Sequence, residues 1–594
     1  MDTVTLTIDG RDITVEKGTT VLQAALEHGI QIPYYCYHPA LGVDGSCRVC
    51  IVKIEKMPKL QTSCSTLCAD GMVVHTRTPD VIEARASVLE FLLINHPLDC
   101  PVCDKGGECP LQDFSYSFGP NRSRMDFARR VFDGEGVKAD VEFGPTLMLN
   151  RNRCILCTRC VRFMKRVDGD PQISIIDRGY GSQIATFQEQ GVHSLLSGNL
   201  MDVCPVGAIT TRDYRFKSRP WDNPQAVDTI CTLCSKGCNT TAWVKGKPEW
   251  AKGPRLVRIT PRFNPQVNGY WMCDIGRFLY HWIESDERLR RPLLRTAAGT
   301  LGPAGWHDVL VKLRETLGST NQAGPAATRF LISAHASHEE IFLIRQIARG
   351  LNGERGDESI AVSWRHQDKA QPANTEFRVP PIDAPNVAGA RDAGLAVGDG
   401  QRPDTSALRR EVEAGRVAAL YVFDPGPDGS IGDLSWVVAA RQAGTLRLLI
   451  VHGTLRTALA RAADAVLPGA AFVEKEATYT NDQGRVQAAS RVIAPPGDAM
   501  EDWQILVNLA VTLGLPMEYA TAAHVRAAVA RAMGDKPGYA ELTQIAFARP
   551  LPARSWLQAS NPSERWKWDF LFQDLPPVKF AGEAVGDRTN EERK

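Results

Sequence analysis

RCILCTRC, residues 153–160, places three cysteines at two-residue intervals. All 16 cysteines of the 594-residue chain lie between Cys36 and Cys273. Thiols grouped at short, regular spacing are typical of metal ligands, whereas disulfides belong to oxidising compartments. The cysteine pattern therefore predicts that the first half of the chain binds metal.

Fifteen cysteines and one histidine fall into four groups with ligand spacing, which we call sets A to D. Set A is Cys36, Cys47, Cys50 and Cys64; set B is His96, Cys100, Cys103 and Cys109; set C is Cys154, Cys157, Cys160 and Cys204; set D is Cys231, Cys234, Cys238 and Cys273. Only Cys68 remains, and we interpret it as a small buried thiol. Its four-residue offset from Cys64 also makes it an alternative fourth member of set A.

The composition is that of an ordinary globular protein with several domains, with 43% hydrophobic and 23% charged residues. A net charge of +1 gives no electrostatic reason to expect nucleic acid or an anionic membrane as a partner. The amino terminus lacks the pattern of a signal peptide, and no apolar run approaches the roughly 18 residues of a membrane span. We therefore expect a reducing, cytoplasmic environment.

Residues 1–78 follow the element order of a plant-type (β-grasp) ferredoxin. Alternating apolar residues on both sides of Asp9-Gly10 predict a hairpin with a favoured turn. The apolar periodicity of residues 21–26 predicts a short helix, and two strand-like runs follow the cysteine loop, the first at 51–54.

Set A nearly matches the spacing of such ferredoxins, which bind a [2Fe-2S] cluster through Cys-x4-Cys-x2-Cys and a distant cysteine. Its first gap is ten residues, which predicts a longer loop over the cluster. Zinc is the alternative, but set A has one Cys-x2-Cys pair where paired zinc motifs have two.

Set B lies in residues 79–118, where a helical apolar face ends at His96-Pro97 and a cysteine-dense loop begins. Imidazole can replace thiolate on cluster iron, so we predict His96 as the fourth ligand of a set with three thiols. An ordinary hydrogen-bonded histidine is the alternative. Glycines 106–107 would allow backbone N–H groups to approach the sulfurs.

Set C lies in residues 141–219 and has the bacterial ferredoxin pattern, three regularly spaced cysteines and a detached Cys-Pro, which indicates a [4Fe-4S] cluster. Arg153, Arg159 and Arg162 flank its cysteines. These arginines either offset the negative charge of the cluster or lie on the solvated surface, and the sequence leaves both open.

Three stretches resemble a known family: PYYCY (33–37) with GSCRVC (45–50), CPVCDKGGECPLQ (100–112), and RCILCTRCVRF (153–163). Over about residues 1–275 the chain is similar to the large iron–sulfur subunit (75-kDa type, the bacterial G subunit) of NADH:quinone oxidoreductase, respiratory complex I. The resemblance implies a [2Fe-2S] cluster on set A and one [4Fe-4S] cluster on each of sets B and C.

Set D, in residues 220–276, resembles the additional [4Fe-4S] site of some bacterial members and the matching domain of molybdopterin oxidoreductases such as formate dehydrogenase. We therefore expect a third [4Fe-4S] cluster there. Molybdenum enzymes of that class commonly supply a downstream Cys or selenocysteine to the metal and a Lys after the fourth ligand. No cysteine follows Cys273, and DIGR (274–277) has no lysine, so no molybdenum is expected. Relatives that use Ser or Asp as the metal ligand keep the alternative open.

Residues 277–594 predict a degenerate molybdopterin-oxidoreductase-like α/β domain. A helical run at 338–351 accompanies buried-strand candidates at 330–332, 418–423 and 446–451. EKEATYTN (474–481) is similar to a segment shared by the large iron–sulfur subunit and molybdopterin enzymes. The polar, Pro/Gly-rich composition of residues 352–410 predicts a weakly ordered connection.

The aromatic tail and the GPDG segment each allow a purely structural interpretation. The aromatic tail after residue 561 is a candidate contact for a neighbouring subunit or a frayed terminus. The glycines of GPDG (426–429) predict a turn, and no Walker A loop or GxGxxG motif indicates an NAD or flavin site.

The resemblance implies a relay. Electrons enter from a flavin-bearing, NADH-oxidising subunit and leave to a ferredoxin-like subunit that leads to quinone, with set D off the main line. It places the chain among the peripheral-arm subunits, on the cytoplasmic side of the bacterial inner membrane, with only indirect membrane association. No side chain is predicted to act as general acid, base or nucleophile. The alternatives are a catalytic molybdopterin oxidoreductase such as NAD-linked formate dehydrogenase, an iron-only hydrogenase, whose additional cysteines are absent, and a zinc-stabilised scaffold.

Overall fold

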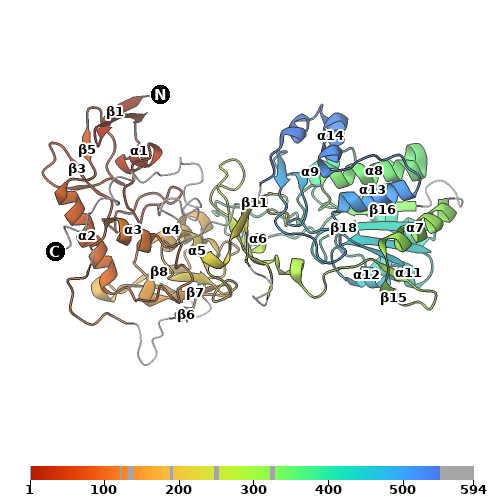
Figure 1. Ribbon diagram of the computed structural model, residues 1–594, viewed down its shortest axis with the longest axis horizontal. Coiled ribbons are helices and arrows are strands. Elements are labelled where there is room, and N and C mark those ends of the chain that lie inside the picture. The colour runs from red at the N-terminus through yellow and green to blue at the C-terminus, as the bar shows by residue number, and fades with distance from the viewer. Residues whose placement is uncertain are drawn as a thin grey trace.

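The computed structural model describes residues 2–120, 122–131, 140–187, 191–246, 253–321 and 328–548. The tail predicted to contact a neighbouring subunit lies outside these ranges. A cysteine-rich amino-terminal part, at the left of Figure 1, is followed by a larger α/β part at the right. Strand β11 (Gln225–Ile230) and helix α6 (Asp274–Phe278) lie between the two parts.

The first unit is a five-stranded sheet in the order β2-β1-β5-β3-β4, packed against helix α1 (Val21–Glu27). Its strands are β1 (Thr3–Ile8), β2 (Arg11–Glu16), β3 (Ile51–Ile54), β4 (Gln61–Thr62) and β5 (Val73–His75). Asp9 and Gly10 join β1 to β2 with φ of 48° and 78°, the positive values that a tight hairpin turn requires. The predicted hairpin and helix are confirmed.

Two helices follow, α2 (Pro79–Ile94) and α3 (Pro110–Phe118). Each begins with proline, whose missing N–H is tolerated in the first helical turn. Helix α2 ends directly before Asn95 and His96-Pro97, as the sequence predicts, and the loop to α3 carries set B.

The third unit contains a three-stranded sheet in the order β10-β7-β6 and a separate β8-β9 hairpin. Its elements are β6 (Asp140–Glu142), β7 (Leu147–Asn150), α4 (Arg159–Phe163), β8 (Ile173–Ile176), β9 (Gln183–Thr186), α5 (Asn199–Val203) and β10 (Ile209–Thr211). Leu156 and Thr158 have φ of 53° and 62°, a left-handed conformation uncommon outside glycine, so the set C loop is tightly wound.

The fourth unit, around set D, is an antiparallel sheet of β11, β12 (Asn239–Val244) and β13 (Leu256–Pro261). Strands β12 and β13 are buried along their whole length. Helix α6 follows the last cysteine of set D.

The α/β part is built on a seven-stranded sheet in the order β15-β14-β20-β19-β18-β16-β17. Its strands are β14 (Leu293–Arg295), β15 (Leu301–Pro303), β16 (Thr328–Ser333), β17 (Ile360–Ser363), β18 (Ala419–Asp424), β19 (Leu448–Gly453) and β20 (Ala465–Pro468). The run from β17 to β20 is parallel, and β14 joins β20 antiparallel. The predicted buried strands are confirmed in β16, β18 and β19.

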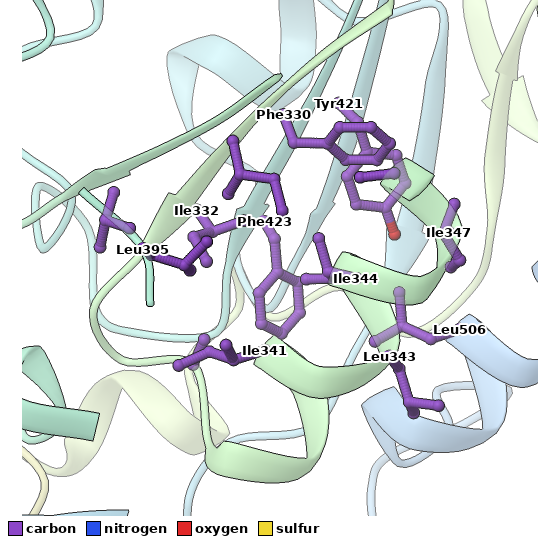
Figure 2. Packing of buried hydrophobic residues seen from close by; sticks show 14 of the residues in the cluster. Phe330, Ile332, Ile341, Leu343, Ile344, Ile347, Leu395, Tyr421, Phe423 and Leu506 are labelled. Carbon is purple, nitrogen blue, oxygen red and sulfur yellow. The ribbon is translucent and has the colours of Figure 1, made fainter. Parts of the chain in front are cut away.

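Helices cover both faces of this sheet, as the buried strands of a parallel sheet require. They are α7 (Trp306–Asn321), α8 (His338–Asn352), α9 (Val387–Asp392), α10 (Ser406–Glu413), α11 (Ser435–Gln442), α12 (Ala458–Ala462), α13 (Asp502–Thr512) and α14 (Ala522–Met533). In Figure 2, Ile341 and Ile344 of α8 lie against Phe423 of the sheet. The predicted α+β to α/β architecture is confirmed.

Residues 352–410 do not form the predicted weakly ordered connection. They contain α9 and most of α10, and their sparse apolar side chains reach two cores: Phe377 joins the core around set C, whereas Val387 joins that of the large sheet. Thr375 Oγ1 also donates to the carbonyl of Asp168 at 2.6 Å. The prediction is wrong because composition counts apolar residues but does not show where they pack.

The α/β part also contains a small hairpin and a turn. Strands β21 (Ala477–Thr480) and β22 (Val486–Ala489) form a hairpin in the EKEATYTN region. GPDG (426–429) is a turn, as predicted, closed by Ser430 N–H donating to the carbonyl of Pro427 at 3.0 Å. No helix within the described ranges combines the length and apolar character needed to cross a bilayer.

Candidate metal centres

The four thiols of set A come together within the first unit. The sulfur of Cys36 lies within hydrogen-bonding range of those of Cys47 and Cys64, and these contacts lower the pKa of Cys36. Cys50 contacts Cys64 in the same way, and all four side chains are buried. Backbone N–H groups also donate to the Cys36 sulfur.

Cys68 lies apart from these contacts. Burial, with a smaller contribution from Glu27, raises the pKa of Cys68 to about 11. Its backbone N–H donates to the carbonyl of Thr19 at 2.9 Å. The structure therefore brings Cys64, rather than Cys68, to the other thiols of set A.

Set B surrounds a cavity of about 190 Å³ that all four of its side chains line. The Nδ1 atom of His96 is buried there, with no hydrogen-bond partner in the part of the chain that the structure describes. Burial, followed by the charge of Arg153, lowers the pKa of His96 to about 4, which leaves the imidazole neutral as a metal ligand must be. Cys100 is exposed at the edge of the site.

Residues 204–207 connect set B to set C. Cys204 belongs to set C, but the carbonyl of the next residue, Pro205, lies 3.9 Å from the Cys109 sulfur. A Cβ atom added at Gly207 would lie 2.0 Å from the Cys103 sulfur. Residues 204–207 therefore supply one thiol to set C, and their backbone at Pro205 and Gly207 packs against the sulfurs of set B.

Set C is formed by the tightly wound loop before α4, by Cys160 within α4 and by Cys204 directly after α5. Cys154, Cys157 and Cys204 all act electrostatically on Cys160, so the four side chains share one site. Burial raises the pKa of Cys157 to about 11. The N–H of Leu156 donates to the Cys154 sulfur at 3.4 Å.

Two arginines of the set C run extend to the set A loop. Arg159 is 2% exposed and donates to the carbonyl of Tyr37. Arg162 donates to the carbonyls of Leu41 at 3.1 Å and Gly42 at 3.0 Å. The surface alternative is therefore wrong for both residues, and they hold the long loop of set A against set C.

Set D is buried and also contacts the set C unit. Cys231, Cys238 and the two other thiols act on one another electrostatically, and the N–H of Cys231 donates to the carbonyl of Cys238 at 2.8 Å. Asp274, next to the last cysteine, accepts from Gly198 N–H at 2.8 Å. Arg277, in the DIGR segment that lacks lysine, pairs with Asp202.

All four sets contribute to one hydrophobic cluster. Its cysteines are Cys36, Cys47, Cys109, Cys157, Cys160, Cys204, Cys231, Cys238 and Cys273, with Cys154 packed against them. The sets are therefore joined by shared packing of their side chains.

These surroundings fit iron–sulfur clusters. Iron–sulfur clusters take thiolate and, in some proteins, imidazole ligands. Set B offers three thiols and an unpartnered imidazole nitrogen around a cavity, and Gly207 leaves room for the sulfurs. Within the described ranges, no three His, Cys, Asp or Glu side chains form a group that could hold a single metal ion.

The sequence does not reveal how three residues take part in these sites. It places Arg153 beside set C, but the side chain lines the cavity of set B. Tyr35 is fully buried near Cys47 and Cys109, and its hydroxyl has no hydrogen-bond partner among the described residues. None of Arg153, Tyr35 and Gly207 has ligand spacing, so only the structure places them at these sites.

The α/β part has no cysteine, and its buried charges pair with one another. Lys475 lies in the EKEATYTN segment and binds Glu340 and, at 2.7 Å, Asp502. Asp502 also lies 3.0 Å from His452 Nε2. These side chains are at most 3% exposed, so the residues that resemble a molybdopterin enzyme here form an internal ion network.

Five family models match consecutive parts of the chain. They describe the 2Fe-2S iron-sulfur cluster binding domain (residues 1–79), the NADH-ubiquinone oxidoreductase-G iron-sulfur binding region (85–124), the ferredoxin-like domain of NADH-quinone oxidoreductase subunit 3 (144–210), the molybdopterin oxidoreductase Fe4S4 domain (224–285) and molybdopterin oxidoreductase (367–512).

Similar proteins include two that align over most of their length. The mitochondrial NADH-ubiquinone oxidoreductase 78 kDa subunit of Neurospora crassa is 30% identical over 88% of this chain and 82% of its own. The G subunit of NADH-quinone oxidoreductase from Rickettsia bellii is 30% identical over 91% of each chain. The G subunit from Streptomyces coelicolor is 44% identical, but the match covers 52% of this chain and 35% of that protein.

Proposed function

The chain belongs to the family of the large iron–sulfur (G) subunit of NADH-quinone oxidoreductase, and on this premise we propose that it relays electrons through iron–sulfur clusters held by sets A to D. It contains 2Fe-2S and 4Fe-4S binding domains. Set A holds one [2Fe-2S] cluster, and sets B, C and D hold one [4Fe-4S] cluster each. The clusters, when bound, supply one-electron redox chemistry.

One observation carries this proposal: His96 and the three thiols of set B surround a single cavity of about 190 Å³. The imidazole nitrogen buried there has no partner among the described residues. A buried polar atom without a partner destabilises the fold by about 1–3 kcal/mol, and a bound cluster would remove that penalty. The side chains bind and orient, and the surrounding apolar residues exclude water.

The contacts between the sets support the order A, C, B for electron transfer. Arg159 and Arg162 hold set A against set C, whereas Pro205 and Gly207 join set C to set B. Set B is the last site in this order, and its Cys100 is exposed. An exposed site is suited to pass electrons to another protein. Set D lies beside set C, outside this order.

We assign the remaining properties from the family. The partners are the NADH-oxidising flavin subunit and the other peripheral-arm subunits of complex I, including a ferredoxin-like subunit toward quinone. The chain lies on the cytoplasmic side of the bacterial inner membrane and binds no nucleic acid. We expect no molybdenum in the α/β part, because no cysteine follows Cys273 and DIGR (274–277) has no lysine.

The test is low-temperature EPR of the reduced full chain with iron quantitation. One binuclear and three tetranuclear centres, about 14 irons per chain, are expected. His96→Ala should alter one tetranuclear signal, whereas His524→Ala, at an exposed position of α14, should alter none.

An unchanged spectrum in His96→Ala would remove this residue from the ligands. A colourless, iron-free chain would contradict the relay itself, and stoichiometric molybdenum would favour the second candidate, a molybdopterin oxidoreductase.

A further inference from the structure

The loop that carries the thiols of set B has little structure of its own. Residues 95–109, which the structure describes in full, form turns but no helix or strand. Cys103 and Cys109 are buried, whereas Cys100 is exposed. A segment held only by turns opens easily, because few bonds must break together. The exposed cysteine of this loop therefore depends on support from another part of the chain.

Arg219 supplies this support from the connection between the set C and set D units. Its Nη2 atom donates to the carbonyl of Cys100 at 2.9 Å, and its Nη1 atom donates to the carbonyl of Pro101 at 2.6 Å. A guanidinium presents its donors in one rigid plane, so a single side chain can bind two successive carbonyls. The two bonds fix the backbone of the loop at Cys100 itself.

Trp221 holds the side chain of Arg219 in position. The guanidinium carbon lies 4.6 Å from the centre of the Trp221 ring, which is the geometry of a cation–π contact. The short 3₁₀ helix Pro220–Asp222 carries this ring, and Asp222 Oδ2 accepts the backbone N–H of Arg219 at 2.9 Å. The carbonyl of Asp222 accepts from Gly246 N–H at 2.7 Å, just after β12. Arg219 and Trp221 are therefore anchored outside the set B loop.

Two glycines of the set B loop leave room for these side chains. A Cβ atom added at Gly106 would lie 2.5 Å from Arg219 Nη2 and 2.8 Å from the carbonyl oxygen of Cys100. A Cβ atom added at Gly107 would lie 3.1 Å from the Trp221 ring. The two glycines therefore form the surface against which Arg219 and Trp221 pack.

We propose that Arg219 and Trp221 form a clamp that keeps the set B loop closed and thereby holds Cys100 in place as a ligand. The inference rests on the proposed function and deepens it, because it names positioning residues for one of the four centres. Neither residue is a ligand: Arg219 acts through the backbone of Cys100, and Trp221 acts through Arg219. Without the clamp the loop should open more often, and each opening exposes the iron of set B to solvent.

The test is the rate at which the full chain, assembled with its clusters, loses iron to the ferrous chelator bathophenanthroline disulfonate under anaerobic conditions. EPR of samples reduced at intervals follows each centre separately, and the set B signal is the one that His96→Ala alters. Arg219→Gln should accelerate loss of the set B signal about tenfold, because it breaks the bonds to both carbonyls.

Two further variants grade the effect. Trp221→Ala should accelerate loss of the set B signal about threefold, because it removes only the cation–π contact. Arg219→Lys keeps the charge but loses the planar fork, so its rate should lie between those of the unaltered chain and Arg219→Gln. In all three variants the signals of sets A, C and D should decay at their original rates.

Arg215→Gln is the matched control. Arg215 also lies over an aromatic ring, that of Phe216, with its guanidinium carbon 4.6 Å from the ring centre. Its Nη2 atom donates to Asp140 Oδ2 at 2.5 Å rather than to the set B loop. The control removes the same charge from the same segment, and the set B rate should not change.

An unchanged set B rate in Arg219→Gln, or equal acceleration at all four sets, would overturn the inference. An unchanged rate in Trp221→Ala would overturn the part assigned to Trp221. If Arg219→Gln assembles every centre except set B, that selective loss supports the clamp. If it assembles none, Arg219→Lys and Trp221→Ala decide by the same criteria.

The unaltered chain separates failure of the clamp from failure of the proposed function. A chain without iron or EPR signals contradicts the relay itself. Normal signals with an unchanged set B rate in the variants contradict only the role of Arg219 and Trp221.

Discussion

The two parts of the molecule treat buried polar groups in opposite ways. In the cysteine-rich part, thiols and an imidazole face a cavity or one another, and the Nδ1 atom of His96 has no partner among the described residues. In the α/β part, the buried Lys475 binds both Glu340 and Asp502. We expect bound clusters to provide the partners of the polar groups in the cysteine-rich part, whereas side chains of the α/β part provide partners for one another.

This contrast also appears in the secondary structure. The cysteine-rich part consists of small units, each built on a sheet of two to five strands. The α/β part is built on one sheet of seven strands with helices on both faces. Small units bury too little apolar surface to be stable alone, and bound metal commonly supplies the missing free energy. Stability in the first part should therefore depend on iron, and stability in the second on its ion network.

Removal of iron should give the largest effect. Anaerobic chelation of the full chain should unfold the region that carries sets A to D and leave the α/β part folded. Limited proteolysis with mass spectrometry should then find new cleavage sites between Cys36 and Cys273, while residues 328–548 remain resistant. Equal resistance of both parts after complete iron loss would contradict the comparison.

Breaking the ion network should give the next largest effect, confined to the other part. Lys475→Met leaves Glu340 and Asp502 buried without their cation, which destabilises a fold by about 3–5 kcal/mol. Urea unfolding of the α/β part measures this loss, and the EPR signals of the clusters should not change. Arg409→Ala, which removes an exposed pair with Glu413, is the control and should change stability by at most about 0.5 kcal/mol.

A change in pH should have the smallest effect. Burial lowers the pKa of His335 and His338 to about 3 in the folded chain, below the usual value of 6.5. Below pH 6.5 the unfolded chain binds protons that the folded chain does not, so the stability present above pH 6.5 is lost as pH falls toward 3.

Between pH 7.5 and 5.5 the two histidines together should contribute a loss of about 1–3 kcal/mol of unfolding free energy. Burial raises the pKa of Glu340 to about 7 and that of Asp424 to about 6, so these carboxyls contribute with the opposite sign and offset part of this loss. His335→Gln should remove about half of the histidine contribution, so urea titrations should show the variant gaining stability relative to the unaltered chain as pH falls. The same pH dependence in both chains would contradict the role of His335.

Local sequence patterns predicted most elements but not their packing. The hairpin at Asp9-Gly10 and the end of α2 before His96 follow from turn chemistry and periodicity. Residues 352–410 were misjudged because the cores that receive Phe377 and Val387 are built from distant parts of the chain. The same limitation hid the position of Arg153 beside set B and that of Gly207 against the Cys103 sulfur, because neither residue has ligand spacing.

The sequence by itself determined the order of the cysteine groups and predicted the four sets of candidate ligands, because thiol spacing and apolar periodicity are local properties of the chain. Only the tertiary structure decided which sets are neighbours. It placed the charge of Arg153 beside set B and the bare backbone of Gly207 against a set B sulfur. The physical reason is that charge and packing act through distance in space, which spacing along the chain does not record.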